Sequence, residues 1–200
     1  MKKLSYDMLI TYLFLALVAV TGVWDYIARG GIKLPRIALI IFTVMAAKLF
    51  FKFTFLKKCK MLYVCVIVFI FFSMYLANVL DFYSITGYDK ILHFASGFLI
   101  GIFGFAFYVF LFGIKNKNAK GVAVVIFTIM FSISAAGVWE IWEFTTDQLF
   151  GLMAQNGLHD TMYDIILGSL SGVIVSIPIY FYTKGRKNRV LDRIVKEIEE

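Results

Sequence analysis

The chain has 200 residues, of which 61% are hydrophobic and 16% are charged, and its formal net charge is +7 at pH 7. A soluble domain needs enough polar atoms to cover its surface, and this composition excludes that class of protein. The basic residues stand in short blocks between apolar runs, a pattern that sets membrane orientation and argues against a nucleic-acid partner. We therefore predict an all-α, polytopic integral membrane protein.

Six apolar runs follow one another along the chain. Each is close to the roughly 20 residues that a helix needs to cross the hydrocarbon core of a bilayer. The first run contains Asp7 and has no convincing cleavage site, so we expect a retained helix and not a signal peptide. Residues 1–183 are then one transmembrane domain. Its predicted helices are 4–28, 36–55, 61–80, 91–112, 121–142 and 161–182.

Residues 184–200 form a basic tail after the last run. Its apolar side chains recur on one stripe between charges, which is typical of a short amphipathic helix at a membrane surface or against a partner. A solvated helical tail has the same pattern. The stripe comprises Val190, Leu191, Ile194, Val195 and Ile198.

Orientation follows from the distribution of Lys and Arg among the linkers. The segment from Glu143 to Asp160 contains neither residue, whereas the linkers after the second and fourth runs are rich in Lys. The positive-inside rule predicts that both termini are cytoplasmic. The predicted cytoplasmic set includes Lys2, Lys3, Lys52, Lys57, Lys58, Lys60, Lys115, Lys117, Lys120 and the tail.

Three acids stand at the outer end of the fifth run, within the stretch 138–147. Glu140, Glu143 and Asp147 are spaced so that a helix projects them from one face within two turns. Acids at the edge of hydrocarbon are costly and usually functional. We therefore take this stretch as the centre of a candidate site.

Two further pairs of ionisable residues fall at the same predicted side. Asp89 and His93 are four residues apart on the fourth helix, and Asp160 and Asp164 are four apart on the sixth. Small residues at matching spacing predict that the fourth, fifth and sixth helices approach closely and carry these groups into one outward-facing pocket. These small residues are Gly97, Gly101, Ser132, Ala136, Gly168 and Gly172.

Carboxylates with one imidazole suit a divalent metal. Mg²⁺, Mn²⁺ and Ca²⁺ prefer oxygen ligands, and a mixture of carboxylate and His also admits Zn²⁺ or iron, so the identity stays open. The same acids could instead bind and release protons. The candidate ligands are Asp89, His93, Glu140, Glu143, Asp147, Asp160 and Asp164. The candidate catalytic groups are His93, Glu140, Glu143 and Asp164.

Some of these residues also have simpler interpretations. Asp89 and Asp160 each precede an apolar run and can cap a helix. Lys90 can neutralise a neighbouring acid, and His159 fits a solvated loop. Neither an HExxH nor a GxSxG motif occurs, so a zinc protease or serine hydrolase has no support. The tryptophans fit an interfacial aromatic belt: Trp24, Trp139 and Trp142.

The motifs also resemble a known family. They comprise Asp89-Lys90-Ile91-Leu92-His93-Phe94 with Gly97, Trp139-Glu140-Ile141-Trp142-Glu143 with Asp147, and Asp160-Thr161-Met162-Tyr163-Asp164 with Gly168 and Gly172. In this order they resemble the YjdF-like family of bacterial inner-membrane proteins and, more distantly, VanZ-like proteins, which are linked with glycopeptide (teicoplanin) resistance. The resemblance covers residues 81–172 and implies a shared architecture.

Three functions are open at this point. The first is a metal-dependent enzyme whose outward-facing pocket acts on a lipid or lipid-linked envelope substrate. The second is an ion- or proton-coupled transporter or flippase that uses the carboxylates as carriers. The third is a non-catalytic, lipid-binding envelope or resistance protein in which the acids stabilise the helix ends. Membrane lipids are expected partners in all three.

Overall fold

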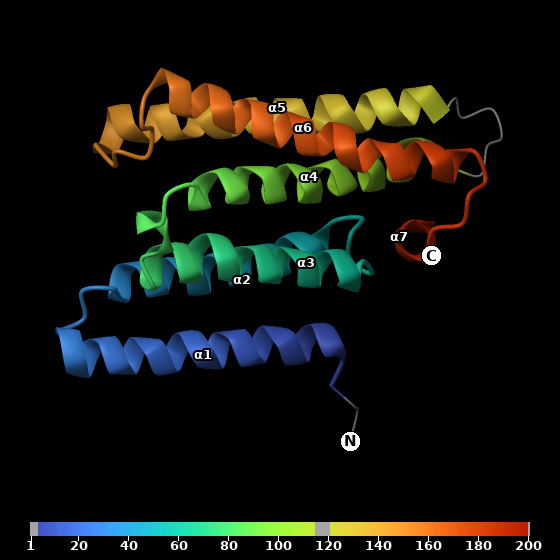
Figure 1. Cartoon of the computed structure of the whole chain (residues 1–200). Coiled ribbons are helices and arrows are strands. Elements are labelled where there is room, and N and C mark those ends of the chain that lie inside the picture. The colour runs from blue at the N-terminus through green and yellow to red at the C-terminus, as the bar shows by residue number, and fades with distance from the viewer. Residues whose placement is uncertain (1–3, 115–120, 200) are drawn as a thin grey trace. The chain divides into compact units, whose positions relative to one another are not determined.

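The computed structural model of the chain describes residues 4–114 and 121–199 (Figure 1). Its elements are α1 (Tyr6–Arg29), α2 (Leu34–Phe53), α3 (Lys60–Ile70), the π-helix η1 (Phe71–Val79), the short 3-10 helix η2 (Phe82–Ser84), α4 (Tyr88–Phe112), α5 (Gly121–Phe150), α6 (Leu158–Thr183) and α7 (Arg189–Glu199). The described residues contain no strand. Within residues 4–114 and 121–199, six helical segments are long and apolar enough to cross a bilayer, the third being Lys60–Val79. The all-α membrane fold is therefore confirmed.

The chain divides into two compact units, Met1–Tyr88 and Asp89–Glu200. Each is described by itself. The orientation prediction rests partly on residues outside the described part of the chain, namely Lys2, Lys3, Lys115, Lys117 and Lys120.

The first unit joins α1 to the third span through polar contacts in an apolar setting. The hydroxyls of Thr11 and Tyr63 lie 3.1 Å apart, and those of Thr21 and Tyr75 lie 2.7 Å apart. Phe14 packs edge-on against Tyr75. Hydrogen bonds of this kind hold membrane helices together where no hydrophobic driving force acts between them.

The α1–α2 turn of the first unit is closed by buried Asp25, whose carboxylate accepts the Lys33 backbone N–H at 2.8 Å. The Lys33 ammonium donates to the carboxylate of Asp81 and to the carbonyl of Asn78. Its hydrogen bond holds the pKa of the exposed Asp81 carboxyl below the usual range. This end of the first unit is thus a structural ion-pair network.

The second unit contains α4, α5, α6 and α7 (Figure 1). A methyl group placed on Gly97 would overlap Ser171 and the backbone of Gly168, and one on Gly168 would lie 3.0 Å from Ala136. The Ser132 hydroxyl lies 3.1 Å from the Gly97 carbonyl and 2.9 Å from the Gly168 carbonyl. The predicted close packing on small-residue faces is therefore confirmed, and Ser132 bonds α5 to both neighbours.

Helix α5 continues to Phe150, eight residues beyond its predicted end at 142. Apolarity marks where a span leaves the hydrocarbon, whereas the helix itself stops only at Gly151, whose φ is +63°. A helix of 30 residues is about 45 Å long, against about 30 Å of hydrocarbon. The acidic end of α5 therefore extends beyond what a membrane span requires.

The tail forms the amphipathic helix that its apolar stripe predicts. Leu191, Ile194 and Val195 of α7 are buried, while its charged residues are mostly exposed. The Asn188 side-chain oxygen accepts the backbone N–H groups of Val190 and Leu191 and so caps the helix.

Candidate functional site

The candidate site lies where the N-terminal ends of α4 and α6 meet the C-terminal end of α5, all within the second unit (Figure 1). Asp89 and His93 occupy one face of the first turns of α4, and Asp160 and Asp164 occupy one face of α6. The contact between Gly97 and Gly168 brings these faces together. The helix packing, and not any loop, therefore positions the polar groups.

Lys90 bonds three aspartates in this cluster. Its ammonium lies 2.8 Å from each carboxylate oxygen of Asp164, 2.5 Å from Asp160 and 3.4 Å from Asp89. The Asp164 side chain is only 2% exposed, whereas that of Lys90 is 29% exposed. A buried carboxylate needs such a partner, because an unpaired charge in this position is strongly destabilising.

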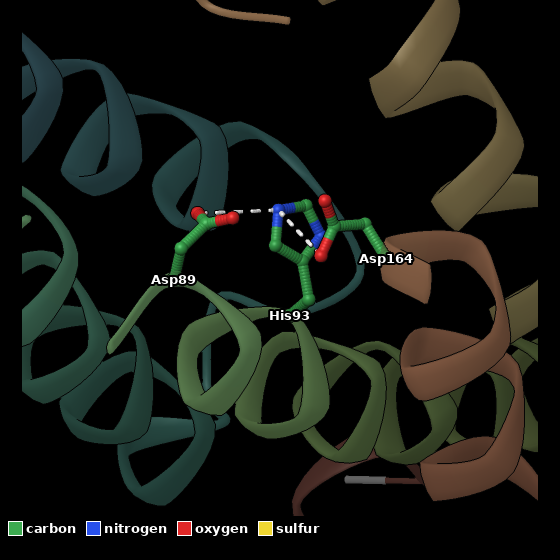
Figure 2. Close-up of side chains that lie close together, drawn as sticks. All are labelled: Asp89, His93 and Asp164. Carbon is green, nitrogen blue, oxygen red and sulfur yellow. Dashed lines mark ion pairs between the residues drawn. The ribbon is translucent and has the colours of Figure 1, made fainter. Parts of the chain in front are cut away.

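His93 lies between two of the same aspartates, as Figure 2 shows. Its Nε2 is 3.6 Å from Asp89 Oδ1 and 3.8 Å from Asp164 Oδ1. Two ligands that are each about 2.1 Å from a metal lie at most roughly 4.2 Å apart. One donor atom from each of the three residues lies within 4.8 Å of the other two, which is close to the spacing that a metal requires.

Glu140 of α5 faces this group from the third helix. Its side chain is 4% exposed, and its Oε1 is buried without a hydrogen-bond partner in the described part of the chain. The carboxyl interacts with the Thr161 hydroxyl and with the charges of His93 and Asp164. A buried acceptor without a partner is costly, so this oxygen favours protonation of the carboxyl or binding of a cation.

The other two acids of α5 have partners of their own. Glu143 accepts a hydrogen bond from the Trp139 indole at 2.8 Å, one turn earlier on the same helix. Asp147 accepts the backbone N–H groups of Ala154 and Gln155 at 2.8 and 2.9 Å. Asp147 therefore shapes the α5–α6 loop and stands apart from the group formed by Asp89, His93 and Asp164.

Comparison with known proteins assigns the chain to a family. The family described as "Predicted membrane protein (DUF2238)" matches residues 6–185. The chain belongs to the DUF2238 family. This DUF2238 chain is also similar to an uncharacterized protein of Thermotoga maritima, with 32% identity over 119 residues. The match spans 58% of this chain and 60% of that protein's length. No solved structure matches the chain.

Lys90 is the residue of this chain's cluster whose importance the sequence pattern does not indicate. Its neighbour Asp89 is the acid that a sequence would pair with it, yet the shortest bonds run to Asp160 and Asp164 on another helix. The sequence feature that could have indicated this role is that Lys90 is a cation among acids and one histidine. His159, by contrast, is exposed in the first turn of α6.

The cluster carries more carboxyl groups than cations. Lys90 and His93 face Asp89, Asp160, Asp164 and Glu140, so full ionisation leaves negative charge in a half-buried position even when His93 is protonated. Such a site attracts a further cation, and its oxygen-rich composition suits a divalent metal.

Proposed function

We propose that this integral membrane protein is a metal-dependent enzyme of the bacterial inner membrane, acting on a lipid or lipid-linked envelope substrate. The observation that carries the proposal is the buried, unpartnered Oε1 of Glu140, whose carboxyl interacts with His93 and Asp164 of the group formed by Asp89, His93 and Asp164. An acidic cluster alone would be weak support. The oxygen supplies a second indication, because its burial is favourable only if a cation or proton completes the cluster.

Asp89, His93 and Asp164 would hold the metal, and Glu140 would act as a fourth ligand or as the base that takes a proton from water. A metal in this position supplies a Lewis acid for a phosphoryl or acyl oxygen. A metal on Asp164 would compete with Lys90, because both oxygens of that carboxylate lie 2.8 Å from the ammonium. Lys90 would keep Asp160 as a partner.

The helix packing below the cluster supports an enzyme over a transporter. Alternating access needs a route to the opposite face of the membrane. Along α4 and α6 the contacts at Gly97, Gly101 and Gly172 leave no space for even one added methyl group. These contacts close the way from the cluster to the opposite face of the membrane. A lipid-linked substrate would reach the cluster from the bilayer side.

The sequence resemblance supports an envelope substrate. The motif order that carries Asp89, His93, Glu140 and Asp164 resembles YjdF-like proteins, and more distantly VanZ-like proteins. By the positive-inside rule the cluster faces the outside of the cytoplasmic membrane. Lipid-linked envelope intermediates would match the outward location of the cluster and the chemistry proposed for its metal.

Metal analysis of the purified full-length protein tests the proposal. We expect bound metal in the wild type, or stabilisation on adding Mn²⁺, Zn²⁺ or Mg²⁺, and loss of both in His93→Ala. The matched control is His159→Ala, which removes the other histidine of the chain from an exposed position. Equal behaviour of the two variants, or no metal response in the wild type, would rule out the metal centre.

The enzymatic half of the proposal needs a separate measurement. Wild-type protein loaded with metal is incubated with bacterial membrane lipid extracts, and released phosphate, acyl or headgroup products are followed by mass spectrometry. We expect products that the His93→Ala protein does not form. Bound metal without any product would contradict the enzymatic activity. It would indicate a binding protein with a structural metal centre.

A further inference from the structure

A second candidate site lies at the opposite end of α6 from the acidic cluster. It is a pocket of about 390 Å³ lined by Ile177, Pro178, Phe181, Arg186, Lys187 and Asn188. Ile177 follows Asp164 by thirteen positions along α6, which corresponds to about 20 Å of helix. The pocket is therefore independent of the proposed metal centre.

The pocket has one apolar wall and one cationic rim. Ile177, Pro178 and Phe181 belong to the last turns of α6. The backbone N–H of Arg186 donates to the Phe181 carbonyl at 3.0 Å, so the chain folds back over the helix end. The Arg186 guanidinium then lies 5.8 Å from the centre of the Phe181 ring. The turn thus holds a cation directly above an apolar surface.

The cations on this rim are available to a ligand. Arg186 and Lys187 are both exposed, and neither has an acidic partner within the part of the chain that the structure describes. The nearby Asn188 oxygen is already used in capping α7. Two adjacent unpaired cations attract an anion, while the wall beneath them attracts hydrocarbon.

We propose that this pocket binds one anionic phospholipid, with the phosphate between Arg186 and Lys187 and an acyl chain along Ile177 and Phe181. The positive-inside rule places this end of α6 at the cytoplasmic leaflet, where anionic lipids reside. A free anion would use only the rim, and a zwitterionic lipid such as phosphatidylcholine would bring its own quaternary ammonium against Arg186 and Lys187. An anionic phospholipid is the ligand that uses both.

The experiment uses delipidated, full-length protein in a mild detergent. Binding of phosphatidylglycerol is compared by native mass spectrometry with binding of phosphatidylcholine carrying the same acyl chains, and inorganic phosphate is added as a competitor. We expect phosphatidylglycerol to bind at least roughly tenfold more tightly than phosphatidylcholine. Inorganic phosphate should not displace it, because phosphate lacks the acyl chain.

Single substitutions locate the site. Arg186→Gln and Lys187→Gln should each weaken phosphatidylglycerol binding by roughly fivefold. The matched control is Lys184→Gln, which removes one positive charge from the same turn. Lys184 does not line the pocket, and its ammonium lies 5.4 Å from the Tyr180 ring. Its substitution should leave the affinity within about twofold, since only long-range attraction is lost.

Three results would overturn the proposal. An equal loss of phosphatidylglycerol affinity in Lys184→Gln would show that the lipid is attracted by basic charge in general and not by this pocket. Equal binding of phosphatidylcholine would show an ordinary lipid contact, and displacement by phosphate would show an anion site without lipid specificity. Circular dichroism and metal binding should stay unchanged in all three variants, which separates loss of this site from misfolding and from failure of the metal centre.

Discussion

The Lys90 ammonium lies 2.8 Å from both carboxylate oxygens of Asp164, a residue 74 positions later in the chain. This pair joins the first turns of α4 and α6 and satisfies a carboxylate that is almost fully buried. A metal that also contacts His93 needs at least one of these oxygens, Asp164 Oδ1, which lies 3.8 Å from His93 Nε2. Lys90 and a metal therefore compete for Asp164.

Replacing Lys90 with Met tests that competition. Without metal, Lys90→Met should lower the free energy of unfolding by about 1–3 kcal/mol, because Asp164 loses its cation. Metal affinity should rise by roughly tenfold, since the competing ammonium is gone. Isothermal titration and thermal melting with and without metal measure both effects. A metal affinity that is unchanged or lower would contradict competition for Asp164.

Glu140→Gln tests whether the buried carboxyl is functional. A neutral amide is less costly to bury than a carboxylate without a partner, so metal-free stability should rise by about 1 kcal/mol. Metal binding should weaken at the same time. Glu143→Gln is the control, because the Glu143 carboxylate already accepts a bond from Trp139. A less stable Glu140→Gln protein with normal metal binding would assign Glu140 a structural role.

Asp147→Ala separates loop shaping from metal binding. Loss of the two bonds to Ala154 and Gln155 should speed hydrogen exchange at these amides and lower stability by about 1–2 kcal/mol. Metal affinity should stay within about twofold, because other residues supply the ligands. Lost metal binding with unchanged exchange would instead make Asp147 a ligand, as its spacing from Glu140 and Glu143 predicts.

Gly97→Ala tests the helix contact beneath the cluster. The added methyl overlaps Ser171 and the Gly168 backbone, so we expect destabilisation of about 3 kcal/mol or more. Gly137→Ala is the matched control, because nothing lies within 4 Å of its added methyl on α5. It should stabilise the protein by about 0.5–1 kcal/mol through helix propensity. Equal melting temperatures for the two variants would contradict the close contact.

The sequence predicted the fold and much of the candidate site because both follow from helix periodicity. Spans are set by apolar length, and the pairs Asp89 with His93 and Asp160 with Asp164 are set by the four-residue repeat. Small residues at Gly97 and Gly168 then indicate which faces meet. These are local patterns that a single sequence contains.

The remaining features depend on contacts between distant segments. Nothing in the stretch Phe71–Val79 indicates a π-helix, in which the Leu80 N–H bonds to the Tyr75 carbonyl five residues earlier. Equally, the spacing of Asp147 suggested a ligand, whereas its partners are backbone groups of the following loop. The central place of Lys90 likewise arises only once α4 and α6 are packed together.

The contact between Gly97 and Gly168 also bears on how fast the cluster can capture a ligand. With no side chain between the two backbones, the first turns of α4 and α6 cannot shift independently, and the donor atoms keep their spacing before any ligand arrives. The helices then need little reorganisation on binding, and displacement of the Lys90 ammonium from Asp164 is the rearrangement that remains. Metal should therefore associate in a single kinetic phase that is limited by this displacement.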